Sequence, residues 1–253
     1  MKRRAKKYVI GIDPHTKRIA GKKYRAKNTI RYSVGVDEVG RGALAGPVVV
    51  AAVCFPIGLK ISNRKLGALK DSKKLSPKLR KLWVEHFKSV SGISYKTARV
   101  YPRAIEKINI SQAANRAASS ASERVIKSLQ HSHILKNVRM FKIFLDGGLY
   151  LKSKEKQLTL RRGFPQQSSG QAERMIVKTI IRADEKITAV KVASIIAKVQ
   201  RDKYMKKLSK KHPRYGFEIH KGYGTRRHIS AIKRYGPSDT HRLTFIKKWH
   251  SIK

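Results

Sequence analysis

The stretch from Tyr32 to Val53, YSVGVDEVGRGALAGPVVVAAV, restricts the fold of this chain more than any other. It predicts two apolar strands, over 32–37 and 46–55, joined by a glycine-rich turn. The first strand ends in two adjacent acids, Asp37 and Glu38, although the chain has 15 acidic residues against 60 Lys and Arg. Closely spaced glycines indicate close approach of the backbone to another group. Paired acids beside such a turn favour a metal site that faces a phosphate; the alternative is a strand end with solvated acids.

Two later segments deliver further acids in a similar way. The segment 141–148 reads as an apolar strand that ends in Asp146 and two glycines. A strand over 175–183 is followed by Asp184, and a helix is expected from Thr188. Asp37 and Asp146 can meet if their strands are parallel neighbours. Asp13 follows a similar apolar run at 8–12, but a second acid and the glycine turn are missing there, so Asp13 is excluded.

The acids that follow these strands determine which chemistry is possible; after the last strand, Asp184 and its neighbour Glu185 are both candidates. Oxygen ligands select Mg²⁺ or Mn²⁺ over zinc, and two such ions about 4 Å apart can activate water and stabilise a leaving oxygen. Adjacent strand residues face opposite ways, so Asp37 and Glu38 can share a site only at a strand end or bulge. The sequence has no Cys/His zinc pattern, Walker loop or nucleophile elbow.

The charge indicates the kind of partner. A net charge of +45 over 253 residues favours a polyanion, nucleic acid above all. No apolar run reaches the roughly 20 residues of a membrane span, so no membrane association is expected. No secretory signal follows the basic N-terminus, and Cys54 is the only cysteine, so a cytoplasmic protein is expected.

The run DEVGRGALAGPV at 37–48 resembles the signature of the ribonuclease HII family, the type 2 ribonucleases H. Further segments resemble family motifs in the same order: DSKKL at 71–75, DGG at 146–148, VASIIAKVQRD at 192–202 and HKGYGT at 220–225. The resemblance spans about 32–245. It implies an α/β ribonuclease H-like fold, with a central mixed five-stranded sheet flanked by helices and a helical C-terminal portion.

The resemblance also implies an activity. The family cleaves the RNA strand of RNA–DNA hybrids and cuts on the 5′ side of single ribonucleotides in duplex DNA, leaving 5′-phosphate and 3′-hydroxyl ends. Asp37, Glu38, Asp146 and Asp184 would be the catalytic residues and would bind two Mg²⁺ or Mn²⁺ ions. The turn would read the 2′-hydroxyl, and Tyr223 would pack on a sugar. The full set of substrate-binding residues implied is Gly40, Arg41, Gly42, Lys70, Lys73, Asn109, Ser194, Lys198, Lys221 and Tyr223.

The chain departs from the family pattern at several places. Glu106 replaces the usual Asp, which makes Asn109 the better contact candidate, and Ser111 is expected to cap the following helix. Residues 1–30 are expected to form a basic extension, and 31–253 the catalytic domain. The polar segment 151–174 is expected to be a loop or insertion within that domain.

Two alternatives stay open from the sequence. One is a non-catalytic basic nucleic-acid-binding protein on the same scaffold, which would not need the complete acid set. The other is a transposase or resolvase nuclease, against which the Gly40-Arg41-Gly42 and 221–224 segments argue. The expected partners are RNA–DNA hybrids and ribonucleotide-containing duplex DNA, and the protein is expected to be a monomer.

Overall fold

The structure is a computed structural model that describes residues 30–130, 138–151 and 174–249. Its centre is a mixed five-stranded sheet in the order β3-β2-β1-β4-β5. The strands are β1 (Ile30–Val39), β2 (Val48–Pro56), β3 (Ser94–Val100), β4 (Val138–Asp146) and β5 (Arg174–Ile180). β1 pairs with β4, and β4 with β5, in parallel, whereas β1–β2 and β2–β3 are antiparallel. The expected mixed sheet and its parallel β1–β4 pair are thus confirmed.

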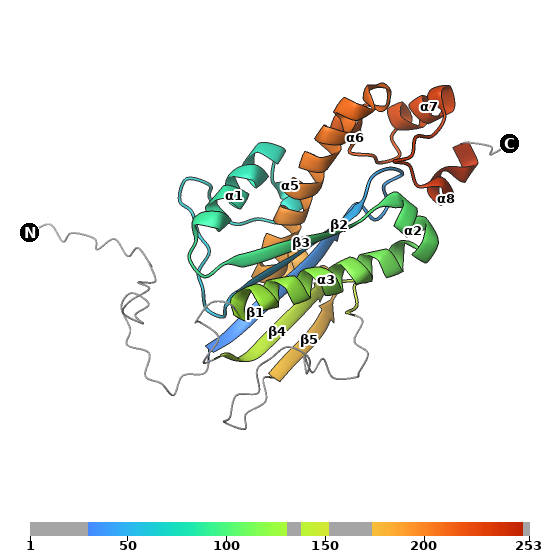
Figure 1. The fold of residues 1–253 in the computed structure, drawn as a ribbon. Helices are drawn as coiled ribbons and strands as arrows, with labels where there is room; N and C mark the ends of the chain where they lie inside the picture. The colour runs from blue at the N-terminus through green and yellow to red at the C-terminus, as the bar shows by residue number, and fades with distance from the viewer. Residues whose placement is uncertain (1–29, 131–137, 152–173, 250–253) are drawn as a thin grey trace, which may run out of the picture.

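Helices cover both faces of the sheet (Figure 1). On one face lies α3 (Ile110–Gln130), preceded by the short α2 (Pro102–Ile108). The small residues Ala113, Ala117 and Ala121 of α3 are buried in one cluster with strand residues such as Val34 and Val36, which lets this helix lie close to the strands. On the other face lie α1 (Pro77–Ser89) and α5 (Thr188–Lys211), and Trp83, Phe87 and Ile195 build a second core there.

Gly35 allows α5 to approach β1 at its first turn. A Cβ atom built on Gly35 would lie 2.0 Å from the carbonyl carbon of Ala189 and 2.3 Å from the backbone nitrogen of Val190. Only a residue without a side chain fits there. The start of α5, and α4 (Ala183–Lys186) just before it, are therefore fixed beside the end of β1.

The C-terminal portion consists of short helical segments at one end of the sheet (Figure 1). They are η3 (Pro213–Tyr215), α6 (Phe217–His220), α7 (Arg226–Tyr235), α8 (Leu243–Ile246) and η4 (Lys247–Trp249). The loop between β1 and β2 lies against them, since the backbone nitrogen of Leu44 donates to the Gly222 carbonyl at 2.8 Å. The nitrogen of Arg242 donates to the Leu44 carbonyl, also at 2.8 Å.

Some expectations need correction. The strand expected over 175–183 ends at Ile180, and Asp184 lies in the helix α4 rather than after a strand. Ser111 does not cap α3; the Asn109 side chain does, accepting from the Gln112 backbone nitrogen at 3.0 Å. Ser76 caps α1, ahead of Pro77, by accepting from the Leu79 backbone nitrogen. Asp13, the 1–29 part of the basic extension and 152–173 of the expected insertion fall outside the described residues. No helix among the described residues has the length and apolar character needed to cross a membrane.

Candidate active site

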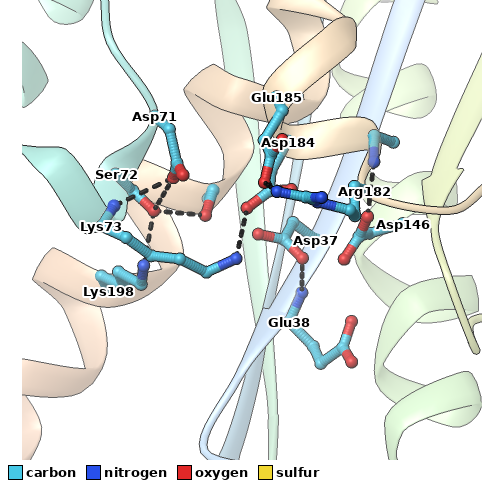
Figure 2. Close-up of polar contacts among 12 residues, drawn as sticks. Asp37, Glu38, Asp71, Ser72, Lys73, Asp146, Arg182, Asp184, Glu185 and Lys198 are labelled. Carbon is cyan, nitrogen blue, oxygen red and sulfur yellow. Dashed lines mark hydrogen bonds and ion pairs between the residues drawn. The ribbon is translucent and has the colours of Figure 1, made fainter.

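Three elements bring the four carboxylates to one end of the sheet. The β1–β4 pairing stops at Val36 and Leu145, so Asp37 and Glu38 extend past it, while β1 stays paired with β2 as far as Val39. Asp146 is the last residue of β4, and α4 presents Asp184 from the side. Figure 2 shows Asp37 between Asp184, Asp146 and Glu38. The sequence prediction that these acids converge agrees with this placement.

Strand alternation divides the acids between the two faces. Val36 packs into the core under α3, so Asp37 points to the opposite face, toward α5. Glu38 points back toward α3, where its Oε1 atom accepts from Arg41 Nη1 at 3.2 Å. The two adjacent acids can act together because the pairing with β4 has ended, which leaves that side of β1 open.

Each carboxylate is held by its surroundings. Asp37 Oδ1 accepts from the Glu38 backbone nitrogen at 2.8 Å, and Asp146 Oδ1 from the Ala183 nitrogen at 2.8 Å. Asp184 Oδ2 accepts from Lys73 Nζ at 3.1 Å. Two buried oxygens, Glu38 Oε2 and Asp184 Oδ1, have no hydrogen-bond partner among the described residues. Such atoms are rare in native proteins, and an ion is one of the standard explanations.

Burial and nearby negative charge make the ionised states of Asp37 and Glu38 unfavourable. Burial, followed by the Glu38 charge, raises the pKa of Asp37 well above its ordinary value, and Asp146 and Asp184 raise this pKa further. A hydrogen bond from the Ser194 side chain opposes the rise. Burial likewise raises the pKa of Glu38, which its contact with Arg41 partly offsets. A cation would relieve both effects.

The donor set therefore suits hard divalent cations, although it is not pre-assembled. Among the described residues, no three Asp, Glu, His or Cys side chains already stand around a common point. Lys73, Arg41 and the Ala183 amide each occupy one carboxylate. Oxygen donors with partnerless atoms fit Mg²⁺ or Mn²⁺, with small side-chain rotations to complete the ligand set.

Polar and basic residues flank the acids on the α5 side. The Ser72 and Ser194 hydroxyls lie 2.8 Å apart, and Lys198 Nζ donates to Ser72 Oγ at 2.5 Å. Burial lowers the pKa of Lys198, which the nearby Asp37 partly counteracts. The Asp71 carboxylate accepts from the Lys73 backbone nitrogen and holds η1 (Ser72–Lys74) in place (Figure 2).

The turn at 40–42 lies next to Glu38. The Arg41 side chain folds back on the protein, donating to the Gly148 carbonyl at 3.2 Å and to Ser111 Oγ at 3.1 Å, as well as to Glu38. Gly42 is exposed, and a Cβ there would meet nothing within 4 Å. The Arg41 side chain thus links the turn to Glu38.

The other residues predicted to bind substrate differ in their exposure and contacts. The Tyr223 ring is 39% exposed, with the Arg201 guanidinium 5.2 Å from its centroid. Lys221 Nζ donates to the Glu218 carbonyl, and Lys70 is exposed. Asn109 is exposed and occupied with capping α3. Asp202 pairs with Arg80 at 3.8 Å and is not part of the acid group.

The sequence reasoning missed a buried polar network in the C-terminal portion. Arg201 and Arg242 are 1% and 0% exposed, and both donate to backbone carbonyls of the 40–47 loop. His220, His228 and His241 are buried together, with the Nε2 atoms of His228 and His241 3.1 Å apart. His220 supports its loop by accepting from the Gly222 nitrogen. No short motif announces these residues, because their partners are distant in sequence.

Comparison with known proteins agrees with this geometry. The family model described as "Ribonuclease HII" matches residues 34–248. The ribonuclease HII of Caldicellulosiruptor bescii is 38% identical over 223 residues, which cover 88% of this chain and 90% of that protein.

Two solved structures share the fold. The ribonuclease H2 of Pyrococcus horikoshii has a TM-score of 0.58 at 23% identity, covering 86% of this chain and 96% of that one. Bst-RNase HIII in complex with Mn²⁺ has a TM-score of 0.54 at 19% identity, covering 88% and 70%. With a family match over nearly the whole described region, and the motif acids gathered at one end of the sheet, the chain belongs to the ribonuclease HII family of endoribonucleases.

Proposed function

We propose that this protein cleaves the RNA strand of RNA–DNA hybrids and cuts duplex DNA on the 5′ side of single ribonucleotides, leaving 5′-phosphate and 3′-hydroxyl ends. The proposed catalytic group is Asp37, Glu38, Asp146 and Asp184. The observation that carries the proposal is the grouping of these four acids, two of them with partnerless buried oxygens. A protein that only binds nucleic acid gains nothing from such repulsion, so the non-catalytic alternative is disfavoured.

The same four carboxylates would hold two divalent ions. Ions bound there would activate the attacking water and stabilise the leaving oxygen of the phosphodiester. We expect Mg²⁺ or Mn²⁺, because the donors are oxygens and a structure of similar fold is in complex with Mn²⁺. The protein supplies rigidity, because Asp146 is oriented by the Ala183 amide, and Asp37 by the Glu38 amide and the Ser194 side chain.

Basic and hydroxyl side chains would position the substrate backbone. Lys73 is the best placed, since its ammonium sits on Asp184 while the side chain stays 65% exposed. On binding, a phosphate at this point would share the Lys73 charge. Lys198 and Ser194 lie deeper, beside Ser72, and support that position.

The turn and Tyr223 would select the cleavage site. A 2′-hydroxyl distinguishes RNA from DNA, and exposed backbone amides of the 40–42 turn can recognise it without a side chain. The half-exposed ring of Tyr223, held by Arg201, can pack against a sugar. Tyr223→Ala is expected to lower cleavage at a single ribonucleotide more than cleavage of a continuous hybrid, where many positions compete; equal losses on both substrates would contradict this role.

The direct test is cleavage of a DNA duplex that carries one ribonucleotide, in Mg²⁺ and in EDTA, with an all-DNA duplex as control. The expected result is a single cut 5′ of the ribonucleotide in Mg²⁺ only, with 3′-hydroxyl and 5′-phosphate ends. Cutting of the all-DNA duplex, cutting in EDTA, or no cut at the ribonucleotide would refute the proposal. A monomeric, cytoplasmic protein is part of the same proposal; the buried free thiol of Cys54 is compatible with a reducing compartment.

A further inference from the structure

A fully buried arginine lies directly beneath the 40–42 turn. The Arg242 guanidinium donates to the carbonyl oxygens of Gly40 and Arg41, both at 2.7 Å, and to that of Gly46 at 2.9 and 3.1 Å. Its side chain is 0% exposed, and it has no carboxylate partner among the described residues. Burying an arginine without a counter-ion costs free energy unless its N–H groups are hydrogen-bonded. The three carbonyls that accept from Arg242 must therefore keep a specific arrangement.

These contacts determine where the turn amides point. In a trans peptide the C=O of one residue and the N–H of the next point in opposite directions, and the described residues contain no cis peptide. With the Gly40 and Arg41 carbonyls directed inward to Arg242, the N–H groups of Arg41 and Gly42 point away from it. Neither amide donates to another of the described residues. Both are therefore free to donate to an outside acceptor.

We propose that Arg242 is a positioning residue for ribonucleotide recognition, which fixes the 40–42 turn with the Arg41 and Gly42 amides directed at the substrate. This inference rests on the proposed function, in which the turn reads the 2′-hydroxyl. Arg242 is about two hundred positions from the turn in sequence, contacts no substrate itself, and acts only through the two peptide groups it holds.

The surrounding contacts support this assignment. The segment that carries Arg242 is held at two points. The backbone nitrogen of Arg242 donates to the Leu44 carbonyl. Glu106 accepts from the Thr244 backbone nitrogen at 3.1 Å and from the Thr244 hydroxyl at 2.9 Å. A Cβ on Gly40 would lie 2.2 Å from Arg201 Nε, so the turn is packed tightly on its inner side as well. These contacts hold the 40–42 turn in one conformation, so its amides keep a fixed direction.

The test compares Arg242→Lys with Ile232→Ala. Lysine keeps the charge but lacks the planar set of donors that holds three carbonyls. Ile232 is buried in the same C-terminal portion and has no hydrogen bond to the turn, so its variant controls for a general loss of stability. Binding is measured by fluorescence anisotropy with Ca²⁺ in place of Mg²⁺, on duplexes with one ribonucleotide and with none, and kcat and KM are measured in Mg²⁺.

The wild type is expected to prefer the ribonucleotide duplex. Arg242→Lys should reduce that preference by about tenfold, the loss of about one hydrogen bond to a reader amide. Its affinity for all-DNA duplex should stay unchanged, and Ile232→Ala should keep the preference. If Arg242→Lys kept the preference, or if Ile232→Ala lost it equally, the inference would be wrong.

Two further outcomes are also decisive. A wild type without any preference would contradict 2′-hydroxyl reading itself, and so the proposed function, whatever the variants did. If Arg242→Lys did not fold, Glu106→Ala would replace it, since it releases the Thr244 contacts and leaves the guanidinium in place. That variant should show a smaller loss of preference at unchanged all-DNA affinity, and an unaltered preference would overturn the proposal.

Discussion

At the scale of single residues, the grouped acids lower the stability of the folded protein while they favour the binding of cations. Asp37 is 5% exposed and lies beside three other carboxylates, so its ionised form is disfavoured in the folded protein. The Lys73 ammonium compensates Asp184 rather than Asp37. Part of the folding free energy is therefore opposed at neutral pH until cations bind.

Asp37→Asn is expected to stabilise the metal-free protein. The folded-state pKa of Asp37 is raised, so above the unfolded-state pKa of about 4 the folded state loses stability as pH rises. Asparagine removes the charge, and its side-chain oxygen can still accept from the Glu38 amide. Thermal unfolding in EDTA should show a Tm advantage of Asp37→Asn over wild type that grows with pH. An advantage that stayed constant or shrank would contradict this reading, and Glu185→Gln, at an exposed ion pair, should show none.

At the scale of secondary-structure elements, the close crossing of α5 over β1 sets the position of Asp184. Gly35 permits the crossing, and α4 continues directly into α5. Asp184 reaches the acids from this helical segment and not from a strand end, which is why its sequence context alone gave the wrong element. The helix that follows, in contrast, was predictable from Thr188 onward.

Gly35→Ala is expected to lower stability by about 1–3 kcal/mol and to lower activity with it. The added methyl would meet backbone atoms of Ala189 and Val190, so α5 must move and carry Asp184 along. The double variant Gly35→Ala/Ala189→Gly serves as the control, because removing the Ala189 side chain leaves those backbone atoms in place. Rescue of Tm and turnover by the second change would show that the clash is not with the backbone.

Because the C-terminal histidines are buried, we expect the protein to lose stability in acid. Burial lowers the pKa of His228 to about 4 and that of His241 to about 3. Each histidine in the unfolded chain takes up a proton near its ordinary pKa of 6.5, whereas the folded one does not, so stability falls as pH drops below about 6.5. His241→Gln should show a shallower fall of Tm between about pH 6.5 and pH 5 than wild type. An equally steep fall would rule out these histidines as the cause.

At the scale of the whole molecule, the strands and helices that a local sequence pattern encodes were predictable. The two opening strands, the strand that ends in Asp146 and the long helix from Thr188 agree with the structure. The contacts that hold the site together were not predictable, because they join distant positions. No periodic signal marks the contacts of Arg242 with Gly40, of Arg201 with Pro47 and of Gly35 with Ala189. The cap by Asn109 depends on the left-handed backbone of that residue (φ 63°).

Cleavage and binding are expected to depend on different groups, cleavage on the converging carboxylates and binding on the basic side chains. The most direct measurement is the single-turnover cleavage rate on a duplex with one ribonucleotide in Mg²⁺, for wild type, Asp146→Asn, Asp184→Asn and Glu185→Gln, with affinity measured in parallel. Asp184 and Glu185 are neighbours on α4, but the Glu185 carboxylate is paired with Arg182 at 2.7 Å.

Asp146→Asn and Asp184→Asn are expected to cut at least about a thousandfold more slowly, since several kcal/mol of transition-state stabilisation depend on these groups. Their affinity for the duplex should remain close to that of wild type, because phosphate contacts supply most of it. Glu185→Gln should cut at the wild-type rate. Near-normal cleavage by either aspartate variant, or an equal loss in Glu185→Gln, would contradict the account.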